Sequence, residues 1–223
     1  MNPPETREQR LEAKRTKMPL ALADLHWHLE DELTWMHVTW KEYLELFAAN
    51  DRRIDLINAT APNFFVHYED MVWRDTMLNL CRVTDPPSSV GKSNLTIRRL
   101  AAAVDHAGLK TKVCTEVEAA VKATEFARDW RNRRIAHRSL DLVLNPQLKP
   151  LANASRRQVE DAFTAIEIPM NSIGTHYEGV HHDFAGVITA FSGSKALVYF
   201  LSSGLEADQV RKGAGTSWSP PHW

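Results

Sequence analysis

A long stripe of apolar residues near the N-terminus constrains the fold of this chain more than any other feature. Between residues 20 and 49, apolar side chains recur at spacings of three and four, which is the period of one face of an α-helix. A stripe of this length needs a partner surface along the whole helix, so the sequence predicts packing against other helices. The stripe consists of Leu22, Leu25, Leu29, Leu33, Met36, Trp40, Tyr43 and Phe47.

The residue pattern of the rest of the chain predicts further helices and no strand. Pro62 should kink the second helical region or start a new helix there. Pro169 should disturb the chain after the helix that Ser155 caps. The predicted fold class is therefore all-α, an antiparallel helical bundle with short loops and a C-terminal extension. The helices are expected at residues 51–83, 95–106, 112–140, 155–168 and 194–212, with loops at 85–94 and 145–155.

Composition and charge place the chain among ordinary globular proteins. Apolar residues make up 43% and charged residues 25%, and the net charge is −1, so any affinity for nucleic acid must come from a local patch. The N-terminal segment lacks the apolar core of a secretory signal, and the longest apolar tract, within residues 187–205, contains a lysine and many small polar residues. We expect a cytoplasmic protein with free Cys81 and Cys114 and no membrane contact. The expected organisation is a flexible segment at 1–18, a helical bundle at 19–174 and an extension of unclear role at 175–223.

An arginine-rich segment, "RDWRNRRIAHRSLD", begins at residue 128 and surrounds the single histidine His137. On a straight α-helix, Arg131 and His137 would lie roughly 120° apart around the axis and about 9 Å apart along it. The two side chains either are unrelated or line a groove whose other wall comes from elsewhere. A second copy of the helix across a two-fold axis would supply that wall. The arginines of the segment are Arg128, Arg131, Arg133, Arg134 and Arg138.

Arginine and histidine at one cleft suit cleavage of RNA without a metal. A base that takes the proton of a ribose 2′-hydroxyl lets this oxygen attack the adjacent phosphorus. Histidine suits proton transfer because its unperturbed pKa is about 6.5. Arginine binds phosphate oxygens in pairs and retains its charge. The structural alternative is that the arginines favour a helix C-terminus and that His137 packs beside Trp130.

The segment "RNRRIAH" resembles the Arg-x(4–6)-His motif of the HEPN superfamily, compact helical domains found in many prokaryotic defence and toxin–antitoxin systems. Two other stretches, "NDRRIDLINATAPNFF" at 50–65 and "NLCRVTDPPSSVGKSNLTIRRL" at 79–100, are similar to the abortive-infection AbiU branch of that superfamily. The resemblance covers roughly residues 20 to 170.

This resemblance implies an up-and-down helical bundle, a homodimer whose two motifs meet at the interface, and metal-independent endoribonuclease activity without a cofactor. It implies a role in phage defence or growth arrest, with an antitoxin as a further partner. Arg131 would stabilise the phosphate, His137 would be the general acid or base, and Asn132 would assist. On grounds of charge, RNA-backbone contacts are expected from Arg128, Arg133, Arg134 and Arg138. Ser139 stands where one subset of the superfamily has a modified tyrosine, which disfavours that antitoxin mechanism.

Other motifs carry weaker signals. "VGKSN" contains Gly-Lys-Ser, but Pro86 stands where a phosphate loop needs glycine. His26 and His28 would diverge on a helix, and "HHD" at 181–183 has no third ligand at motif spacing, so no metal site is predicted. Two alternatives to the nuclease remain: a non-catalytic helical module that binds RNA or a protein partner, and an enzyme of another class using the 181–183 cluster.

Overall fold

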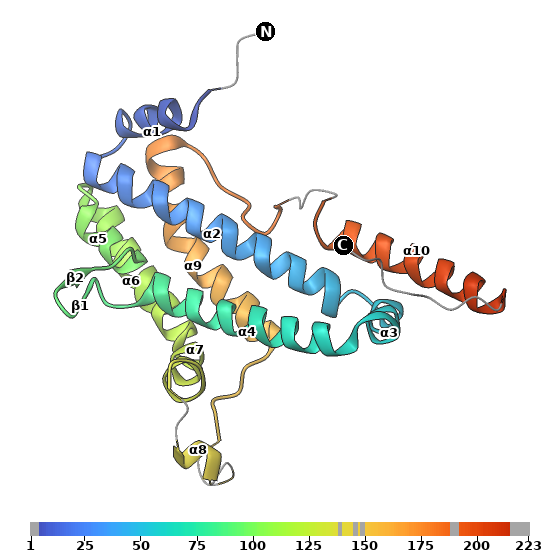
Figure 1. The fold of residues 1–223 in the computed structure, drawn as a ribbon. Helices are drawn as coiled ribbons and strands as arrows, with labels where there is room; N and C mark the ends of the chain where they lie inside the picture. The colour runs from blue at the N-terminus through green and yellow to red at the C-terminus, as the bar shows by residue number, and fades with distance from the viewer. Residues whose placement is uncertain (1–4, 138–139, 145–146, 148–149, 188–191, 215–223) are drawn as a thin grey trace. The chain divides into compact units, whose positions relative to one another are not determined.

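The computed structural model shows a chain built of helices joined by short connections (Figure 1). It describes residues 5–137, 140–144, 147, 150–187 and 192–214. Within those residues the only strands are two of two residues each, so the fold class is all-α, as predicted. In chain order the elements are α1 (Arg7–Arg15), α2 (Leu20–Phe47), α3 (Asp51–Thr60), α4 (Pro62–Thr84), β1 (Ser88–Ser89), β2 (Lys92–Ser93), the 3₁₀ turn η1 (Ile97–Arg99), α5 (Leu100–Ala103), α6 (Ala107–Ala123), α7 (Glu125–Trp130), the π-helical turn η2 (Arg131–Ile135), α8 (Leu140–Leu144), α9 (Arg156–Glu178) and α10 (Ser194–Gly213).

The chain divides into two compact units. The first unit comprises Met1–Met36 and Arg74–Gly186, and the second comprises His37–Trp73 and Val187–Trp223. Helices α2 and α4 contribute residues to both units. The predicted domain limits at 19–174 and 175–223 stay predictions, and α9 runs across residue 174.

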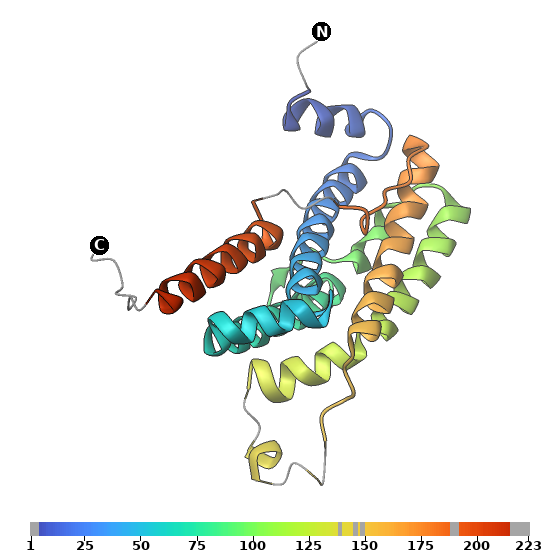
Figure 2. The same cartoon turned by 90° about the vertical axis from the view of Figure 1, so that its right-hand side faces the viewer.

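In the first unit, α6 and α9 lie side by side and run in opposite directions (Figures 1 and 2). Both helices bury a stripe of apolar residues at helical spacing. Packing of such a stripe supplies most of the stability of a helix in a protein. The buried residues of the two stripes are Leu109, Val113, Val117 and Ala120 on α6, and Val159, Ala162, Phe163, Ile166, Met170 and Ile173 on α9.

Helix α9 begins as predicted and ends later than predicted. Ser155 and Gln158 form a capping box at its start. Pro169 was expected to disturb the chain, but the helix continues through it to Glu178. The proline is itself buried, and the apolar stripe continues at Met170 and Ile173, so packing offsets the lost backbone hydrogen bond. Gly179, in the left-handed conformation with φ of 67°, ends the helix.

The predicted helix at 112–140 is wrong, because the chain breaks at Thr124. The carbonyl of Val121 accepts hydrogen bonds from the Thr124 hydroxyl and from the Arg128 guanidinium, both at 3.0 Å. A carbonyl occupied by side chains no longer serves the helix ladder, and a threonine that bonds back to its own helix favours a bend. Helix α6 therefore ends at Ala123, and α7 leaves in a new direction (Figure 2).

The N-terminal segment also differs from the expectation of disorder. Thr6 and Gln9 form a capping box, and α1 follows it. Lys14 near the end of α1 is buried, with Nζ 2.9 Å from Glu30 Oε2 and 2.7 Å from Glu178 Oε2. These ion pairs, which local sequence patterns do not reveal, attach α1 to α2 and α9.

The second unit has an aromatic core. Trp40 and Tyr43 stack with ring centroids 4.8 Å apart, and Trp73 packs against both of them. Phe47 continues the row and contacts Phe65. Helix α10, predicted at 194–212, packs along α3. Aromatic contacts of this kind stabilise a small core beyond the area they bury.

None of the helices in the described ranges combines the length and the hydrophobicity needed to cross a lipid bilayer.

The two cysteines should differ sharply in reactivity. Cys81 on α4 is buried, and burial raises the pKa of its thiol to about 11, whereas Cys114 on α6 is exposed. Since the thiolate is the reactive form, iodoacetamide at pH 8 should modify one cysteine quickly and the second only after denaturant is added. Mass spectrometry with a Cys114→Ser control checks this assignment, and equal labelling rates for both thiols would contradict the buried position of Cys81.

Candidate functional site

The arginine-rich segment forms α7 and the π-helical turn η2 rather than one α-helix. The turn is closed by a hydrogen bond from Ala136 N to Arg131 O, 2.8 Å long, which spans five residues instead of four. The straight-helix geometry predicted for Arg131 and His137 therefore does not apply. Single π-helical turns are rare and occur frequently at functional sites.

Arg131 is held by a carboxylate that sequence reasoning missed. Its Nη1 lies 2.9 Å from Asp85 Oδ1 and 2.7 Å from Asp85 Oδ2, and its Nε donates to Asn132 Oδ1 at 3.1 Å. The Nη2 group makes no hydrogen bond with any residue in the described part of the chain, so two donors remain for a ligand such as a phosphate. Asp85 directly follows the last residue of α4 and lies 46 positions before Arg131 in the sequence, and no spacing rule links Asp85 to Arg131.

His137 lies just beyond the π-helical turn and is exposed to solvent. Among the described residues, no hydrogen bond or ion pair joins it to Arg131. The side chains of Arg131 and Asn132 are thus assembled at one place, while His137 follows them on the surface. Arg138 and Ser139 lie outside the described residues.

Arg128 is turned into the protein. Its Nη1 donates to Val121 O and Thr124 Oγ1, both at 3.0 Å, and its Nη2 donates to Thr84 O at 2.9 Å and Thr84 Oγ1 at 2.7 Å. Desolvation by burial lowers the pKa of this guanidinium from its ordinary value. The bonds connect the end of α4 to the corner between α6 and α7. An RNA contact by Arg128 stays a prediction, and it would compete with these bonds.

Arg133 and Arg134 lie on different sides of the turn. Arg133 Nη1 is 3.2 Å from both oxygens of Asp129 and donates to Pro150 O at 3.0 Å. Arg134 is exposed, with its guanidinium carbon 5.1 Å from the centre of the Trp130 ring. A cation over an indole face presents a flat surface on which a base can stack.

The local charge balance remains positive. Four arginines lie between residues 128 and 134, while Asp85 pairs with Arg131 and Asp129 pairs with Arg133. The group therefore carries a net charge of about +2 in a chain whose net charge is −1. Any affinity for nucleic acid would need a local excess of positive charge of this kind.

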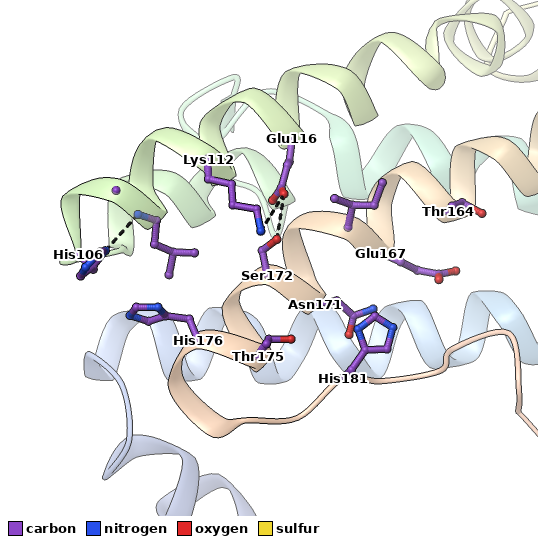
Figure 3. A pocket seen from close by; sticks show the side chains of 13 residues that line it. His106, Lys112, Glu116, Thr164, Glu167, Asn171, Ser172, Thr175, His176 and His181 are labelled. Carbon is purple, nitrogen blue, oxygen red and sulfur yellow. Dashed lines mark hydrogen bonds and ion pairs between the residues drawn. The ribbon is translucent and has the colours of Figure 1, made fainter.

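A separate groove of about 700 Å³ lies between α6 and α9 (Figure 3). His106 and His176 face each other at one end, with ring centroids 4.8 Å apart. Glu116 accepts a hydrogen bond from Ser172 at 2.9 Å and pairs with Lys112 at 3.7 Å. The groove contains none of the predicted catalytic residues, and the sequence analysis did not anticipate it.

The chain is thus a helical domain with an Arg-x(5)-His motif. Arg131 and Asn132 lie in the π-helical turn, and His137 follows it. The sequence profile of the HEPN_AbiU2 family, described as AbiU2, matches residues 20–193, so the chain belongs to this family of HEPN domains. The resemblance stated from the sequence is thereby confirmed, over a longer stretch than the predicted 20–170. Comparisons with curated proteins and with solved structures gave no match.

Arg128→Ala should destabilise the fold strongly. It leaves two carbonyls and two buried threonine hydroxyls without a charged donor, which should cost about 3 kcal/mol. The melting temperature should fall by roughly 6 °C or more. Arg134→Ala is the matched control and should cost no more than about 1 kcal/mol, since it removes a surface cation–π contact. Equal losses for the two variants would contradict the structural assignment of Arg128.

Proposed function

We propose that this protein is a metal-independent endoribonuclease of the HEPN type that works as a homodimer. The observation that supports this most is the state of Arg131: its guanidinium is oriented by Asp85 and Asn132, and its Nη2 group is open to a ligand. The alternative of an unrelated surface arginine does not explain why one side chain is fixed from two directions at a π-helical turn.

The reaction that fits these residues is transesterification within RNA. The His137 imidazole takes the proton of a 2′-hydroxyl, the freed oxygen bonds to the adjacent phosphorus, and the bond from phosphorus to the 5′-oxygen breaks. The leaving oxygen receives a proton, and the products are a 2′,3′-cyclic phosphate and a 5′-hydroxyl. Arg131 stabilises the charge that develops on the phosphorane, and Asn132 orients the guanidinium through its Oδ1.

A two-fold dimer supplies the second wall of the cleft. No hydrogen bond or ion pair joins Arg131 to His137 of the same copy within the described residues, which supports a site composed of groups from two copies. A second copy of η2 across the axis would bring two arginines and two histidines together. A bound phosphodiester would offset the repulsion between the arginines.

Membership of the AbiU2 family supports a role in abortive infection, phage defence or a toxin–antitoxin system, in the cytoplasm and with RNA as substrate. An antitoxin would then be a protein or RNA that covers the cleft. Arg133 and Arg134, and Arg138 beyond the described residues, are proposed as contacts to the RNA backbone.

A non-catalytic RNA-binding module is the second candidate, and one observation favours it. Asp85 already neutralises part of the Arg131 charge, as a structural ion pair would. This candidate predicts salt-sensitive RNA binding without strand cleavage.

Arg131→Ala and His137→Ala should each lower the rate of RNA cleavage by at least about a hundredfold, because each removes a group that acts in the transition state. The assay follows labelled single-stranded RNA in EDTA, with a 2′-deoxy substrate that should stay intact. Exposed Arg157→Ala and His181→Ala are matched controls that should cleave normally. Equal cleavage by all variants would reject the nuclease proposal. RNA binding without cleavage by wild-type protein would also reject it and would favour the non-catalytic binding module.

Mixing the two inactive variants tests the shared cleft. A heterodimer of Arg131→Ala and His137→Ala subunits retains one arginine and one histidine in the composite cleft, so an equal mixture should regain part of the activity after subunit exchange. Activity is measured together with sedimentation velocity. A mixture that forms heterodimers and stays inactive would show that each subunit needs its own pair.

A further inference from the structure

A second cluster of chemistry-bearing side chains lies at the opposite end of α9 from the arginines. The chain just before α9 contacts Arg133 through Pro150, whereas the cluster contains Glu178, the last residue of the helix. The helix between them is about 33 Å long at 1.5 Å per residue. The cluster is therefore independent of the proposed nuclease site.

The centre of the cluster is a contact between a fully buried histidine and a glutamate one turn later on α2. His26 is 0% exposed, and its Nδ1 lies 3.2 Å from Glu30 Oε1. Glu30 Oε1 also lies 3.2 Å from His182 Nε2, and apart from these contacts with the two imidazoles neither atom has a hydrogen-bond partner among the described residues. The other nitrogen of the ring, Nε2, lies 3.0 Å from Met170 O, which can only accept a proton. In the neutral ring Nε2 therefore carries the hydrogen, and the lone pair of Nδ1 points at a carboxylate oxygen.

Two lone pairs facing each other in a buried place require a positive charge between them, either a proton or a metal ion. A histidine that donates one N–H to a backbone carbonyl and presents the other nitrogen is arranged as metal-binding histidines are. Two ligand atoms bound to one tetrahedral zinc ion lie about 3.3 Å apart, given bonds of about 2.0–2.1 Å. The observed separation of 3.2 Å between His26 and Glu30 agrees with this spacing.

Further ligands are within reach. Ligand atoms of His26, Glu30 and Glu178 all lie within 4.8 Å of one another. His182 Nε2 lies 3.2 Å from Glu30 Oε1, on a side chain that is 43% exposed. Two histidines and two carboxylates form a donor set that suits zinc.

The net charge of the cluster also favours the binding of a cation. Two carboxylates and the ammonium of Lys14 sum to −1, so one further positive charge, a proton on an imidazole or a metal ion, balances the cluster. Lys14 bonds to the Oε2 atoms of both glutamates and leaves Glu30 Oε1 to the imidazoles. It therefore acts as an outer donor to the carboxylates, as the partners of metal-bound carboxylates do.

The side-chain amide of Asn171 holds the loop that carries His182 close to the helices. Asn171 Oδ1 accepts from His182 N at 2.8 Å, and Asn171 Nδ2 donates to His182 O at 3.1 Å. Gly174 allows this approach, since a Cβ there would lie 3.0 Å from Val180 O and 4.0 Å from each imidazole ring of His26 and His182. The loop is thus positioned before any ligand binds.

We propose that His26, Glu30 and Glu178, with His182 as the fourth ligand, bind one structural zinc ion that ties α2 to the end of α9. Neither histidine motif considered in the sequence forms this site alone. One member of "HWH" and one member of "HHD" meet at Glu30, and His28 and His181 take no part.

The test is zinc content and affinity of the purified full chain. Wild-type protein should retain about one zinc per chain after dialysis, and Co²⁺ in its place should give the visible spectrum of a tetrahedral site. Glu30→Gln and His182→Ala should weaken zinc binding by about a hundredfold. His28→Ala and His181→Ala are the matched controls and should bind as wild type.

Folding is followed by circular dichroism, with and without EDTA. If Glu30→Gln does not fold, His182→Ala on its partly exposed loop decides the matter. Zn²⁺ should raise the melting temperature of wild-type protein and of the two control variants, and should raise that of His182→Ala much less. Absence of saturable zinc binding by wild-type protein would overturn the proposal. The positive charge between His26 Nδ1 and Glu30 Oε1 would then be that of a proton. Equal binding by ligand and control variants would overturn it as well. RNA cleavage is scored separately, so a failure of either proposal leaves the other intact.

Discussion

The arrangement of the arginine-rich site depends on one half-buried guanidinium, that of Arg128. Arg128 bonds to Thr84 at the end of α4 and to Val121 and Thr124 at the corner between α6 and α7. This joins two segments of the chain that are distant in sequence, and it interrupts the helix that would otherwise continue from α6. Because the corner is fixed at this place, the residue after Thr84 lies where Arg131 can reach it. The pair of Asp85 and Arg131 is therefore a consequence of the Arg128 contacts.

Pairing with Asp85 has two opposite effects on Arg131. It removes part of the charge that would attract RNA, and it holds the guanidinium in one orientation, which reduces the entropy lost when a phosphate binds. In a partly exposed pair the charge effect is modest because solvent screens it. Orientation is then the more valuable contribution, since a transition state is stabilised only by donors that already point at the developing charge.

Much of the fold was predictable because its signals are local. The stripe of α2, the restart at Pro62 and the capping box at Ser155 each depend on residues a few positions apart. The break at Thr124 and the passage of α9 through Pro169 were not predictable, because the first depends on Arg128 and the second on packing along the whole helix. The candidate catalytic residues came from the motif, whereas Asp85 is 46 positions from its partner and carries no motif of its own.

The two ends of α9 differ in how far their charged side chains are exposed to solvent. At one end the polar groups of the motif are exposed, as the proposed polymer substrate and the proposed second copy would require. At the other end the side chains are largely shielded from solvent, and Lys14 forms ion pairs with two carboxylates of the same chain. The shielded residues are Lys14, His26, Glu30 and Glu178. Shielded charges stabilise a fold only when every one has a partner, so a structural ion fits there and substrate does not. The proposed catalytic role is therefore compatible with the arginine-rich end, where Asn132, Arg134 and His137 are exposed to solvent.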